Sequence, residues 1–515
     1  MEVIEVPVLR AFSSAPQATR RDGSRSKPHP MRTAASPCAL RLCVLLPVLV
    51  AAGCTASAEE VRPPPDQLAF PTGMAVSPDE HTLFVVNANS ELRYDSGSIG
   101  VIDLDQVQSV IQGWANGTIP SDYACSQDLD HTETLQCDEQ KFFRADSGVR
   151  VGNFATDLAI QDFSDGGPVN LRVFVPTRGD PSVAWADYDG DRLRCNASSE
   201  NYPLCDDAHR LTSLDNDPDL APLPNEPFGV FTHVIPTYDG NGNRLADRGF
   251  AMVSHLATGS VTLIDAPADS AKVRIVDMVN NVFLPDVITG TGLRGATTMA
   301  GRAMPTVAPP PPVPAVPDEL VYVVSSSEDR VQTFTIGQRD GSAAYLLPGS
   351  FFFLNAVGNG AGNSNDTRGV AFSASGDRLY LVNRLPPSVQ IYDTSTTASG
   401  IPRNAPLGSS DVCRQASTLA VANLDPVGDR IYVTCFQDGQ VYVVDPTGQS
   451  RVEDIISVGR GPFAAAVLTG DNLPGKPKQL FVSNFLEDTI AVIDLSLTSP
   501  KRNRVVLRIG TPRAR

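Results

Sequence analysis

The sequence is poor in the residues and motifs that mark common enzyme classes. Its 515 residues include six histidines and two tryptophans, Trp114 and Trp185, and aromatic residues make up 7%. It contains no H-E-x-x-H, no G-x-S-x-G, no phosphate-binding loop and no glycine-rich dinucleotide fingerprint after a predicted strand. It also lacks the C-x-x-C spacing that is typical of zinc sites. No familiar catalytic motif therefore suggests a reaction.

Basic residues are scarce relative to acidic ones. The chain has 41 Lys and Arg against 58 Asp and Glu, which gives a formal net charge of −17. The acidic residues are spread along the chain without a long run of like charge. This composition argues against binding of nucleic acid or anionic lipid through a broad basic patch.

The N-terminal apolar run is too short to span a bilayer. It covers eleven residues, LCVLLPVLVAA at 42–52, follows Arg32 and Arg41, and ends just before Cys54. This is the layout of a secretion signal. The end of the run resembles the lipobox of bacterial lipoproteins, with Ala51 where leucine is usual. The resemblance implies that Cys54 carries the lipid and forms the mature N-terminus.

The signal divides the chain into four parts. Residues 1–30 are basic and polar and do not belong in front of a signal, so we expect translation to start at Met31 and the signal peptide to cover 31–54. Residues 55–69 are small, charged and then proline-rich, which predicts a tether. Residues 70–515 are numerous enough for one closed domain with insertions. We expect the protein on the periplasmic or outer face of the cell envelope, anchored to the outer membrane.

Cysteine usage supports export. Of nine cysteines, Cys38 and Cys43 would leave with the signal and Cys54 would carry lipid. An oxidising compartment would pair the remaining six, which fall into three local pairs. The expected disulfides are Cys125–Cys137, Cys195–Cys205 and Cys413–Cys435. The last pair also follows from geometry, because Cys413 precedes the first strand of a predicted hairpin and Cys435 closes the second.

One short phrase recurs along the chain. It reads GMAVSPDEHTLFVVN at 73–87 and GVAFSASGDRLYLVN at 369–383, and it returns at 418–445 and 462–494. Each apolar run is short, rich in Val, Ile, Tyr and Phe, and bounded by turn residues, as a strand covered on both faces would be. The unit is an antiparallel meander, and such units can bury their faces by stacking around a ring.

The phrase that closes each unit gives the number of units. Five closing phrases end plainly at Asp103, Asp265, Asp393, Asp445 and Asp494, and two weaker ones end at Asp187 and Ile336. The sequence therefore predicts an all-β fold, a single seven-bladed β-propeller with inserted loops.

The repeat resembles the YVTN-type β-propeller repeat of bacterial and archaeal extracytoplasmic and surface proteins. IYVTCF at 431–436 retains three letters of that name. The resemblance is good over 369–511 and 70–105 and loose between 150 and 340. It implies the fold and leaves the function open, because propellers host many functions.

Three insertions interrupt the repeats, at about 105–147, 195–226 and 296–318. The last contains a proline-rich run at 305–317, which we expect as an extended loop between two strands of one blade. Long loops on a rigid scaffold are where recognition concentrates. The insertions favour a non-catalytic binding or scaffold protein whose partners are envelope proteins or glycans. The alternative is a metal-dependent hydrolase that resembles lactonase-type propellers, with its site at the central channel.

Two local patterns are candidate sites. In DGNGNRLAD, Asp239, Asn241, Asn243 and Asp247 stand at positions one, three, five and nine. The pattern resembles the short Ca²⁺ loops on hairpins of integrin-type propellers, with Arg244 where glycine is usual. The alternative is an ordinary hairpin turn rich in Asn and Gly.

The second pattern is a pair of histidines. His233 and His255 lie on adjacent predicted strands and could approach each other, or they could be unrelated polar positions at strand ends.

Overall fold

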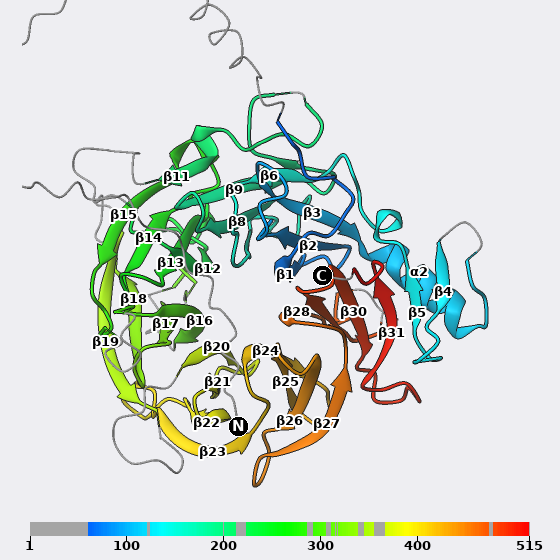
Figure 1. Cartoon of the computed structure of the whole chain (residues 1–515). Helices are drawn as coiled ribbons and strands as arrows, with labels where there is room; N and C mark the ends of the chain where they lie inside the picture. Colours follow the sequence, from blue (N-terminus) through cyan, green and yellow to red (C-terminus); the bar gives the residue numbers. More distant parts are fainter. Residues whose placement is uncertain are drawn as a thin grey trace, which may run out of the picture. The chain divides into compact units, whose positions relative to one another are not determined.

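The computed structural model describes residues 60–120, 124–198, 200–212, 223–285, 292–304, 311–314, 316, 318–337, 344–354, 366–472 and 477–513. The chain divides into a unit of Met1–Glu59 and a unit of Glu60–Arg515. The predicted start at Met31, the signal peptide and Cys54 lie outside the described residues. The second unit is a ring of seven β-sheets (Figure 1).

The strands of each blade follow the chain from the centre of the ring outwards. Blade one holds β1 (Pro71–Val76), β2 (Thr82–Asn87), β3 (Gly97–Asp103) and β6 (Val149–Val151). Blade two holds β7 (Ala159–Asp162), β8 (Leu171–Thr177) and β9 (Ser182–Tyr188), with β10 (Leu193–Arg194) and β11 (Arg210–Thr212) at its outer edge. Blade three holds β12 (Pro227–Ile235), β13 (Arg248–His255), β14 (Val261–Asp265) and β15 (Arg274–Val279). Blade four holds β16 (Ala296–Met304), β17 (Asp318–Ser325), β18 (Arg330–Gly337) and β19 (Tyr345–Phe353).

The last three blades contain four strands each and no added helix in their described residues. Blade five holds β20 (Thr367–Phe372), β21 (Arg378–Arg384), β22 (Pro387–Asp393) and β23 (Ala405–Asp411). Blade six holds β24 (Ala416–Asn423), β25 (Asp429–Cys435), β26 (Gln440–Asp445) and β27 (Arg451–Ser457). Blade seven holds β28 (Pro462–Leu468), β29 (Gln479–Asn484), β30 (Thr489–Asp494) and β31 (Arg504–Ile509). The predicted seven-bladed propeller is confirmed.

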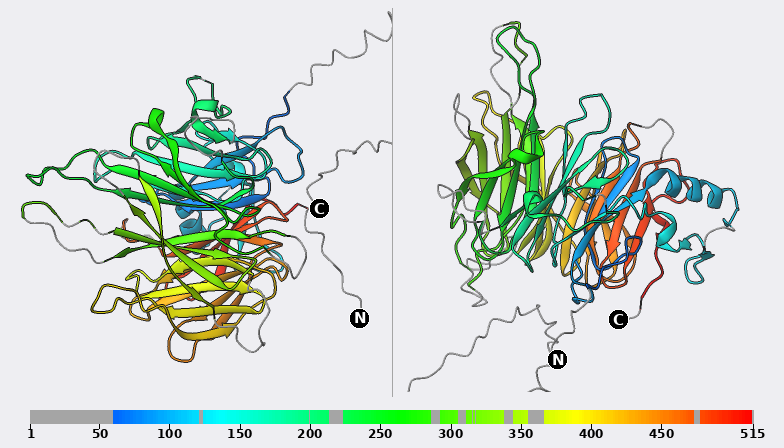
Figure 2. Two further views of the ribbon diagram at one scale, coloured as in Figure 1. Left: turned by 90° about the vertical axis from the view of Figure 1, so that its left-hand side faces the viewer. Right: turned by 90° about the horizontal axis from the view of Figure 1, so that it is seen from above.

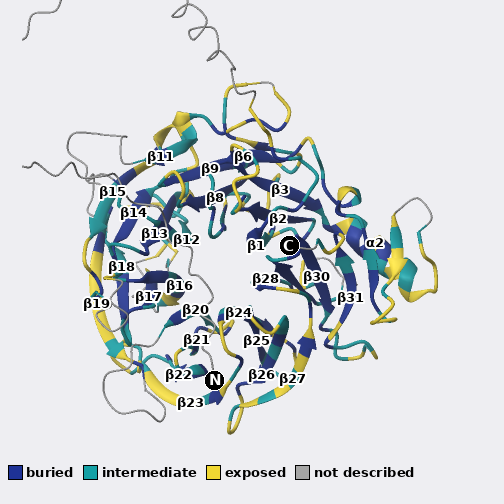
Figure 3. Ribbon diagram, viewed as in Figure 1, coloured by how far each residue is buried: buried dark blue, intermediate teal, exposed yellow. Residues whose placement is uncertain are grey.

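The repeated phrases map onto equivalent strands. Every closing phrase is the third strand of its blade, and the runs that we matched in blades five, six and seven are the second strands β21, β25 and β29. The second and third strands are almost wholly buried, as Figure 3 shows, because each sheet is covered on both faces by its neighbours. This explains why their apolar runs are continuous rather than alternating.

The closing aspartates form local hydrogen-bonded turns. In the last three blades the carboxylate oxygen Oδ1 of Asp393, Asp445 or Asp494 accepts a hydrogen bond of 2.9 Å from the backbone amide two residues later. In blade one Asp103 caps a helix instead, accepting from the Gln106 amide at 3.0 Å. The strand-ending carboxylate therefore directs the chain into the next segment.

Side-chain hydrogen bonds join every neighbouring pair of blades near the start of the inner strands. The donor–acceptor pairs are Thr72 Oγ1 to Ala155 O (2.8 Å), Thr156 Oγ1 to Phe228 O (2.6 Å), Ser254 Oγ to Thr297 O (2.9 Å), Thr297 Oγ1 to Thr367 O (2.9 Å), Arg384 Nε to Ala416 O (2.6 Å), Thr434 Oγ1 to Phe463 O (3.4 Å) and the Phe70 amide to Asp488 Oδ1 (2.7 Å). Backbone carbonyls that the sheets leave unpaired are satisfied in this way.

The first insertion closes the ring. It contains α2 (Leu104–Ala115), β4 (Cys125–Gln127), β5 (Leu135–Cys137) and the short helix η1 (Glu139–Lys141). β5 pairs in parallel with β31, the outer strand of blade seven, so that Leu135 lies opposite Leu507 and Cys137 opposite Ile509. A segment of the first blade is thus hydrogen-bonded to the last. We call β4 and β5 the clasp.

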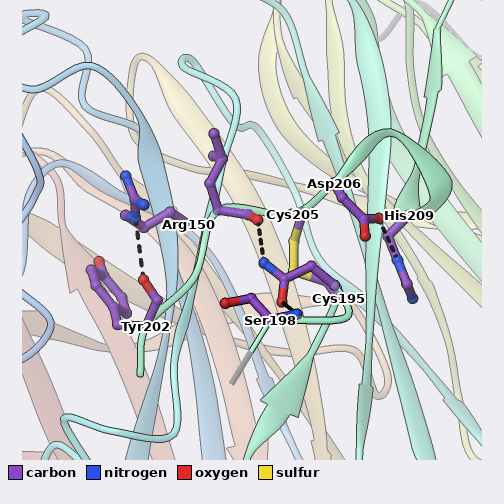
Figure 4. The surroundings of a disulfide bond; sticks show 9 residues. Arg150, Cys195, Ser198, Tyr202, Cys205, Asp206 and His209 are labelled. Carbon is purple, nitrogen blue, oxygen red and sulfur yellow. Dashed lines mark hydrogen bonds and ion pairs between the residues drawn. A yellow bond between two sulfur atoms is a disulfide. The ribbon is translucent and has the colours of Figure 1, made fainter. Parts of the chain in front are cut away.

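The second insertion covers the outer strand of blade one, as the first insertion covers the outer strand of blade seven. The segment 203–205 runs parallel to β6: the Arg150 amide donates to Pro203 O (2.8 Å) and the Cys205 amide to Arg150 O (3.0 Å). Figure 4 shows this segment beside the Cys195–Cys205 disulfide, where Arg150 also reaches the Tyr202 carbonyl oxygen. The short helix η2 (Asp207–His209) follows it.

All three predicted disulfides are confirmed: Cys125–Cys137, Cys195–Cys205 and Cys413–Cys435. The first holds the two strands of the clasp together, because Cys125 and Cys137 are opposite residues of β4 and β5. The second fixes the segment that covers β6. The third joins the beginning of blade six to the end of β25, as its position in the hairpin predicts.

The predicted insertions need one correction in extent. Residues 296–304 form β16, the inner strand of blade four, so the third insertion is the loop 305–317 alone. That loop joins β16 to β17 within one blade, as expected for the proline-rich run. The error arose because the small residues of β16 do not resemble the aliphatic strands of the repeat.

The second half of the expected tether lies against blade one. Leu68 is fully buried, the Val61 amide donates to the Asp95 carboxylate at 2.7 Å, and Glu60 forms an ion pair with the buried Arg150. Within the described part of the chain, no helix is long and apolar enough to cross a membrane. The boundary at residue 69 and the membrane tether stay predictions.

Opening the clasp should weaken the ring at its point of closure. We expect the double variant Cys125→Ser, Cys137→Ser to lose about 3 kcal/mol of unfolding free energy, the value for a disulfide loop of this length. We also expect faster hydrogen exchange at the β31 amides that face β5. Denaturant unfolding and hydrogen-exchange mass spectrometry measure both.

The matched control is Cys413→Ser, Cys435→Ser, which opens a disulfide inside blade six. It should also lower the unfolding free energy, but it should leave exchange in β31 unchanged. Equal exchange in β31 for both double variants would contradict the role of the clasp.

Candidate functional site

Three consecutive blades carry long loops on the same face of the ring. The loops join the first and second strands of blades two, three and four and cover 163–170, 236–247 and 305–317. The equivalent turns of blades one, five and six, 77–81, 373–377 and 424–428, are shorter, and the connection in blade seven, 469–478, is also long but is not adjacent to these three blades. Figure 2 shows green loops from this part of the chain projecting beyond the strands on one side. We call the three loops the three-loop face.

The three loops contact one another. The guanidinium of Arg244, in the blade-three loop, forms an ion pair with Asp165 of the blade-two loop. On its other side Gly242 lies against Pro312 of the blade-four loop, so closely that a Cβ atom at Gly242 would be 2.6 Å from the Pro312 carbonyl oxygen. Gly242 also has a φ of +81°, which favours glycine. The face is therefore one connected surface.

The blade-three loop is held by the carboxylate of Asp239. This group accepts from the Asn241 and Asn243 amides, both at 2.8 Å, and from the Asn243 side chain at 2.8 Å. The hydrogen bonds from Asn243 lower the pKa of Asp239. The loop is exposed at Asn241 and presents Leu245, whose side chain is 53% exposed, to solvent.

The same loop contains the four residues of the expected calcium pattern. Asp239 and Asn243 are brought together, whereas Asp247 forms an ion pair with Arg244 at 2.8 Å. In this arrangement Asp239 holds a turn through its own backbone, and a bound cation would have to displace Arg244 from Asp247. Calcium binding by Asp239, Asn241, Asn243 and Asp247 stays a prediction.

A half-buried acid and base lie where the blade-three and blade-four strands lead into these loops. His233 is on β12 and Glu319 on β17, with His233 Nδ1 3.9 Å from Glu319 Oε2. Glu319 lies above Gly301, where a Cβ atom would be 2.2 Å from its carboxylate. Its side chain is 12% exposed. Because residue 301 has no side chain, the carboxyl group of Glu319 fits between the two blades.

Burial governs the charge of this pair. It raises the pKa of Glu319 to about 7, although the charge of Arg302 lowers it, and it lowers the pKa of His233. The separation of 3.9 Å exceeds hydrogen-bonding distance, and His233 Nε2 is buried without a partner among the described residues. Burial therefore favours the uncharged form of both groups.

The structure separates the two histidines that the sequence suggested as neighbours. His233 lies opposite Phe250 in the β12–β13 pair, whereas His255 lies opposite Pro227 at the other end of that pair. Of the two interpretations, the structure supports unrelated polar positions, at opposite ends of the strand pair, and not an approach of the two histidines. His255 Nε2 contacts Thr262 Oγ1 at 2.9 Å, and burial lowers the pKa of this histidine to about 3.

The channel side of the ring carries one further perturbed carboxyl group. Asp157 lies at the junction of blades two and three, where it accepts from the Val230 amide at 3.1 Å. Burial raises its pKa to about 6. Over the described residues, no three His, Cys, Asp or Glu side chains gather closely enough to hold a metal ion.

The comparisons with known proteins concern the fold. No protein-family model and no curated protein sequence matches the chain. Solved structures do match. The Kuenenia stuttgartiensis hydrazine synthase is 12% identical with a TM-score of 0.45, and the match covers 85% of this chain and 98% of that chain. The Pseudomonas aeruginosa periplasmic gluconolactonase PpgL is 16% identical with a TM-score of 0.42, and the match covers 76% of this chain and 87% of that chain.

A third match is the β-propeller domain of Myceliophteria thermophila Cps50 (Swd1), which is 10% identical with a TM-score of 0.43. The match covers 85% of this chain and 100% of that chain. Similarities of this size do not extend to activity. The ring of seven sheets defines the class of this protein, a seven-bladed β-propeller. The resemblance to the YVTN-type repeat rests on the residues quoted above, and no family model matches to place the chain more narrowly.

Glu319 should make the protein less stable as the pH rises. Its folded pKa is raised above the ordinary value of 4.5, so its contribution is present in full below pH 4.5 and is lost as the pH rises through about 7. A shift of this size corresponds to roughly 3 kcal/mol. We expect Glu319→Gln to remove that part of the pH dependence in denaturant unfolding.

The control is Glu91→Gln, at an exposed position, which should reproduce the wild-type profile. Asp157 shifts in the same direction, so some decline with pH should remain in Glu319→Gln. A variant profile that runs parallel to the wild type would show that Glu319 is not the group responsible.

Proposed function

We propose that the protein is a lipid-anchored, extracytoplasmic binding or scaffold protein of the bacterial cell envelope. Its partner, an envelope protein or glycan, would be held on the three-loop face. The observation that carries the proposal is the contact of loops from three consecutive blades through Arg244, Asp165 and Pro312. Loops that support one another lose less conformational freedom on binding, which favours affinity.

Two further observations support the location. Three disulfides are typical of a protein folded in an oxidising compartment. The end of the N-terminal apolar run resembles a lipobox with Cys54 as its cysteine. The lipid anchor and the outer membrane are parts of the proposal that rest on this resemblance.

The alternative is a metal-dependent hydrolase at the central channel. Such a site would use carboxylates and histidines from several blades. The two carboxyl groups whose pKa values burial raises, Asp157 and Glu319, lie in two different blade junctions. What favours binding is the connected, exposed surface of the three-loop face, with Leu245 as an apolar contact at its edge.

Site-specific photocrosslinking tests where the partner binds. A photoreactive residue at Asn241, in the exposed part of the blade-three loop, should crosslink to one envelope component in intact cells. The matched control is Leu92, which is 58% exposed in the loop between β2 and β3 on the opposite face. Protease treatment of the product separates a protein partner from a glycan. Absence of a product at Asn241, or the same product from Leu92, would contradict the proposal.

Replacing Cys54 with serine tests the anchor. We expect the full-length Cys54→Ser variant to leave the membrane fraction and to lose incorporation of labelled palmitate. Cys43→Ser is the matched control, because Cys43 lies in the apolar run and should not affect either measurement. Membrane retention and labelling of the Cys54→Ser variant would show that this cysteine is not the attachment site.

A further inference from the structure

Three consecutive blades carry a large side chain at the same position, on the face of the ring opposite the three-loop face. The position comes directly after the residue of the second strand that pairs with the start of the inner strand, and it holds Arg384, Phe436 and Phe485. The equivalent residues of blades one and four are Ala88 and Ser326. The repeat therefore does not require a large side chain here.

Phe436 and Phe485 belong to a group of four aromatic side chains. Phe463 is on β28 and Phe70 directly precedes β1, and β28 lies between β24 and β1 near the centre of the ring (Figure 1). The ring centroid of Phe485 lies 5.1 Å from that of Phe70, 5.7 Å from that of Phe463 and 6.0 Å from that of Phe436. All but Phe70 are partly exposed. We call these four residues the aromatic wall.

Arg384 extends the aromatic wall by one blade. Its Nε donates to the carbonyl oxygen of Ala416 at 2.6 Å, and the amide of Phe436 donates to the carbonyl oxygen of Gln415 at 3.1 Å. Arg384 and Phe436 are thus held by neighbouring residues of the connection between blades five and six. A cationic group and an apolar surface therefore adjoin each other at this junction.

The positive charge of Arg384 is not balanced by an ion pair with any described residue. Its Nη atoms also donate no hydrogen bond to the described part of the chain. Asp366 pairs with Arg368 instead, at 2.5 Å. Burial and the charge of Arg368 lower the pKa of Arg384 to about 10, which keeps it charged at neutral pH. Charges that are taken out of water are usually paired, so this junction favours a bound anion.

We propose that Arg384 and the aromatic wall bind an organic carboxylate with an aromatic or apolar body. The carboxylate lies on the two Nη atoms of Arg384, which form a planar fork that matches its two oxygens. The body of the ligand packs on the Phe436 ring, where aromatic groups gain stacking contacts. This site lies on the face opposite the three-loop face and does not depend on a partner there.

Both parts of the ligand follow from the surface that it covers. A neutral apolar ligand would cover the phenylalanines but leave the charge of Arg384 unpaired. An inorganic anion would pair with Arg384 but leave the rings of Phe436, Phe463 and Phe485 in water. A carboxylate with an aromatic body removes apolar surface from water and supplies the missing counter-charge.

Three small molecules separate the two contributions in isothermal titration calorimetry of the purified exported protein. The probe is 3-phenylpropionate, which has both the charge and the ring, and we expect a dissociation constant of about 1 mM or lower for a ligand of this size. The amide 3-phenylpropanamide lacks the charge, and propionate lacks the ring. We expect each of them to bind at least tenfold more weakly.

Variants locate the site. Arg384→Gln and Phe436→Leu should each weaken the binding of 3-phenylpropionate, the first by about tenfold or more. The matched controls are Arg274→Gln on β15 and Phe351→Leu on β19, whose side chains are 58% and 52% exposed, and they should bind as the wild type does. Arg368→Gln should also weaken binding, because it leaves Asp366 free to pair with Arg384.

Thermal unfolding of each variant shows whether it is folded, since Arg384 also joins two blades through Ala416. If Arg384→Gln does not fold, Phe436→Leu and Arg368→Gln decide the question. Three results would overturn the proposal: no binding of 3-phenylpropionate at ten times the expected dissociation constant, equal affinity for the acid and the amide, or unchanged affinity in the folded variants.

Discussion

The ring depends on how its last blade is joined to its first. All four strands of blade seven come from the C-terminal end of the chain, and all four of blade one come from the N-terminal side. The clasp, which comes from the insertion of blade one, extends the sheet of blade seven, because β5 pairs with β31. Cys125–Cys137 holds β4 to β5 within the clasp. The hydrogen bond from the Phe70 amide to Asp488 joins the same two blades at the inner strands.

This requirement accounts for where the irregular segments lie. The two disulfide-bonded insertions both reach back to the preceding blade and cover its outer strand, first β31 and then β6. Both disulfides hold the covering segment rather than an exposed loop tip. The sequence suggested that these insertions serve recognition, and part of each has a structural role instead. The loops of blades two to four instead contact one another, through Arg244, Asp165 and Pro312.

The regular features of the fold could be predicted because they repeat. Burial of the second and third strands on both faces produces continuous apolar runs, and the phrase that closes each unit recurs, so seven units could be counted. Cys413–Cys435 followed from the geometry of a single hairpin. The pairing of Leu135 with Leu507 could not be predicted, because it joins short, unrepeated segments that are far apart in the chain. The Glu319–His233 pair was missed for the same reason, and the room for it depends on a glycine in a third strand, β16.

Different blades of the ring thus have different structural roles. Blades five to seven keep short turns between most of their strands and follow the repeat closely, and their inner strands are joined by the same kind of side-chain hydrogen bond as the rest. The insertion of blade one closes the ring by pairing with blade seven, and the insertion of blade two covers the outer strand of blade one. Blades two to four support the three-loop face, and where their strands lead into it burial raises the pKa of Glu319 to about 7. A buried carboxyl group without a hydrogen-bonding partner costs stability once it ionises. That cost lies at the base of the loops of blades three and four. Burial also raises the pKa of Glu139, which follows the clasp, but there the charge of Arg513 opposes the shift.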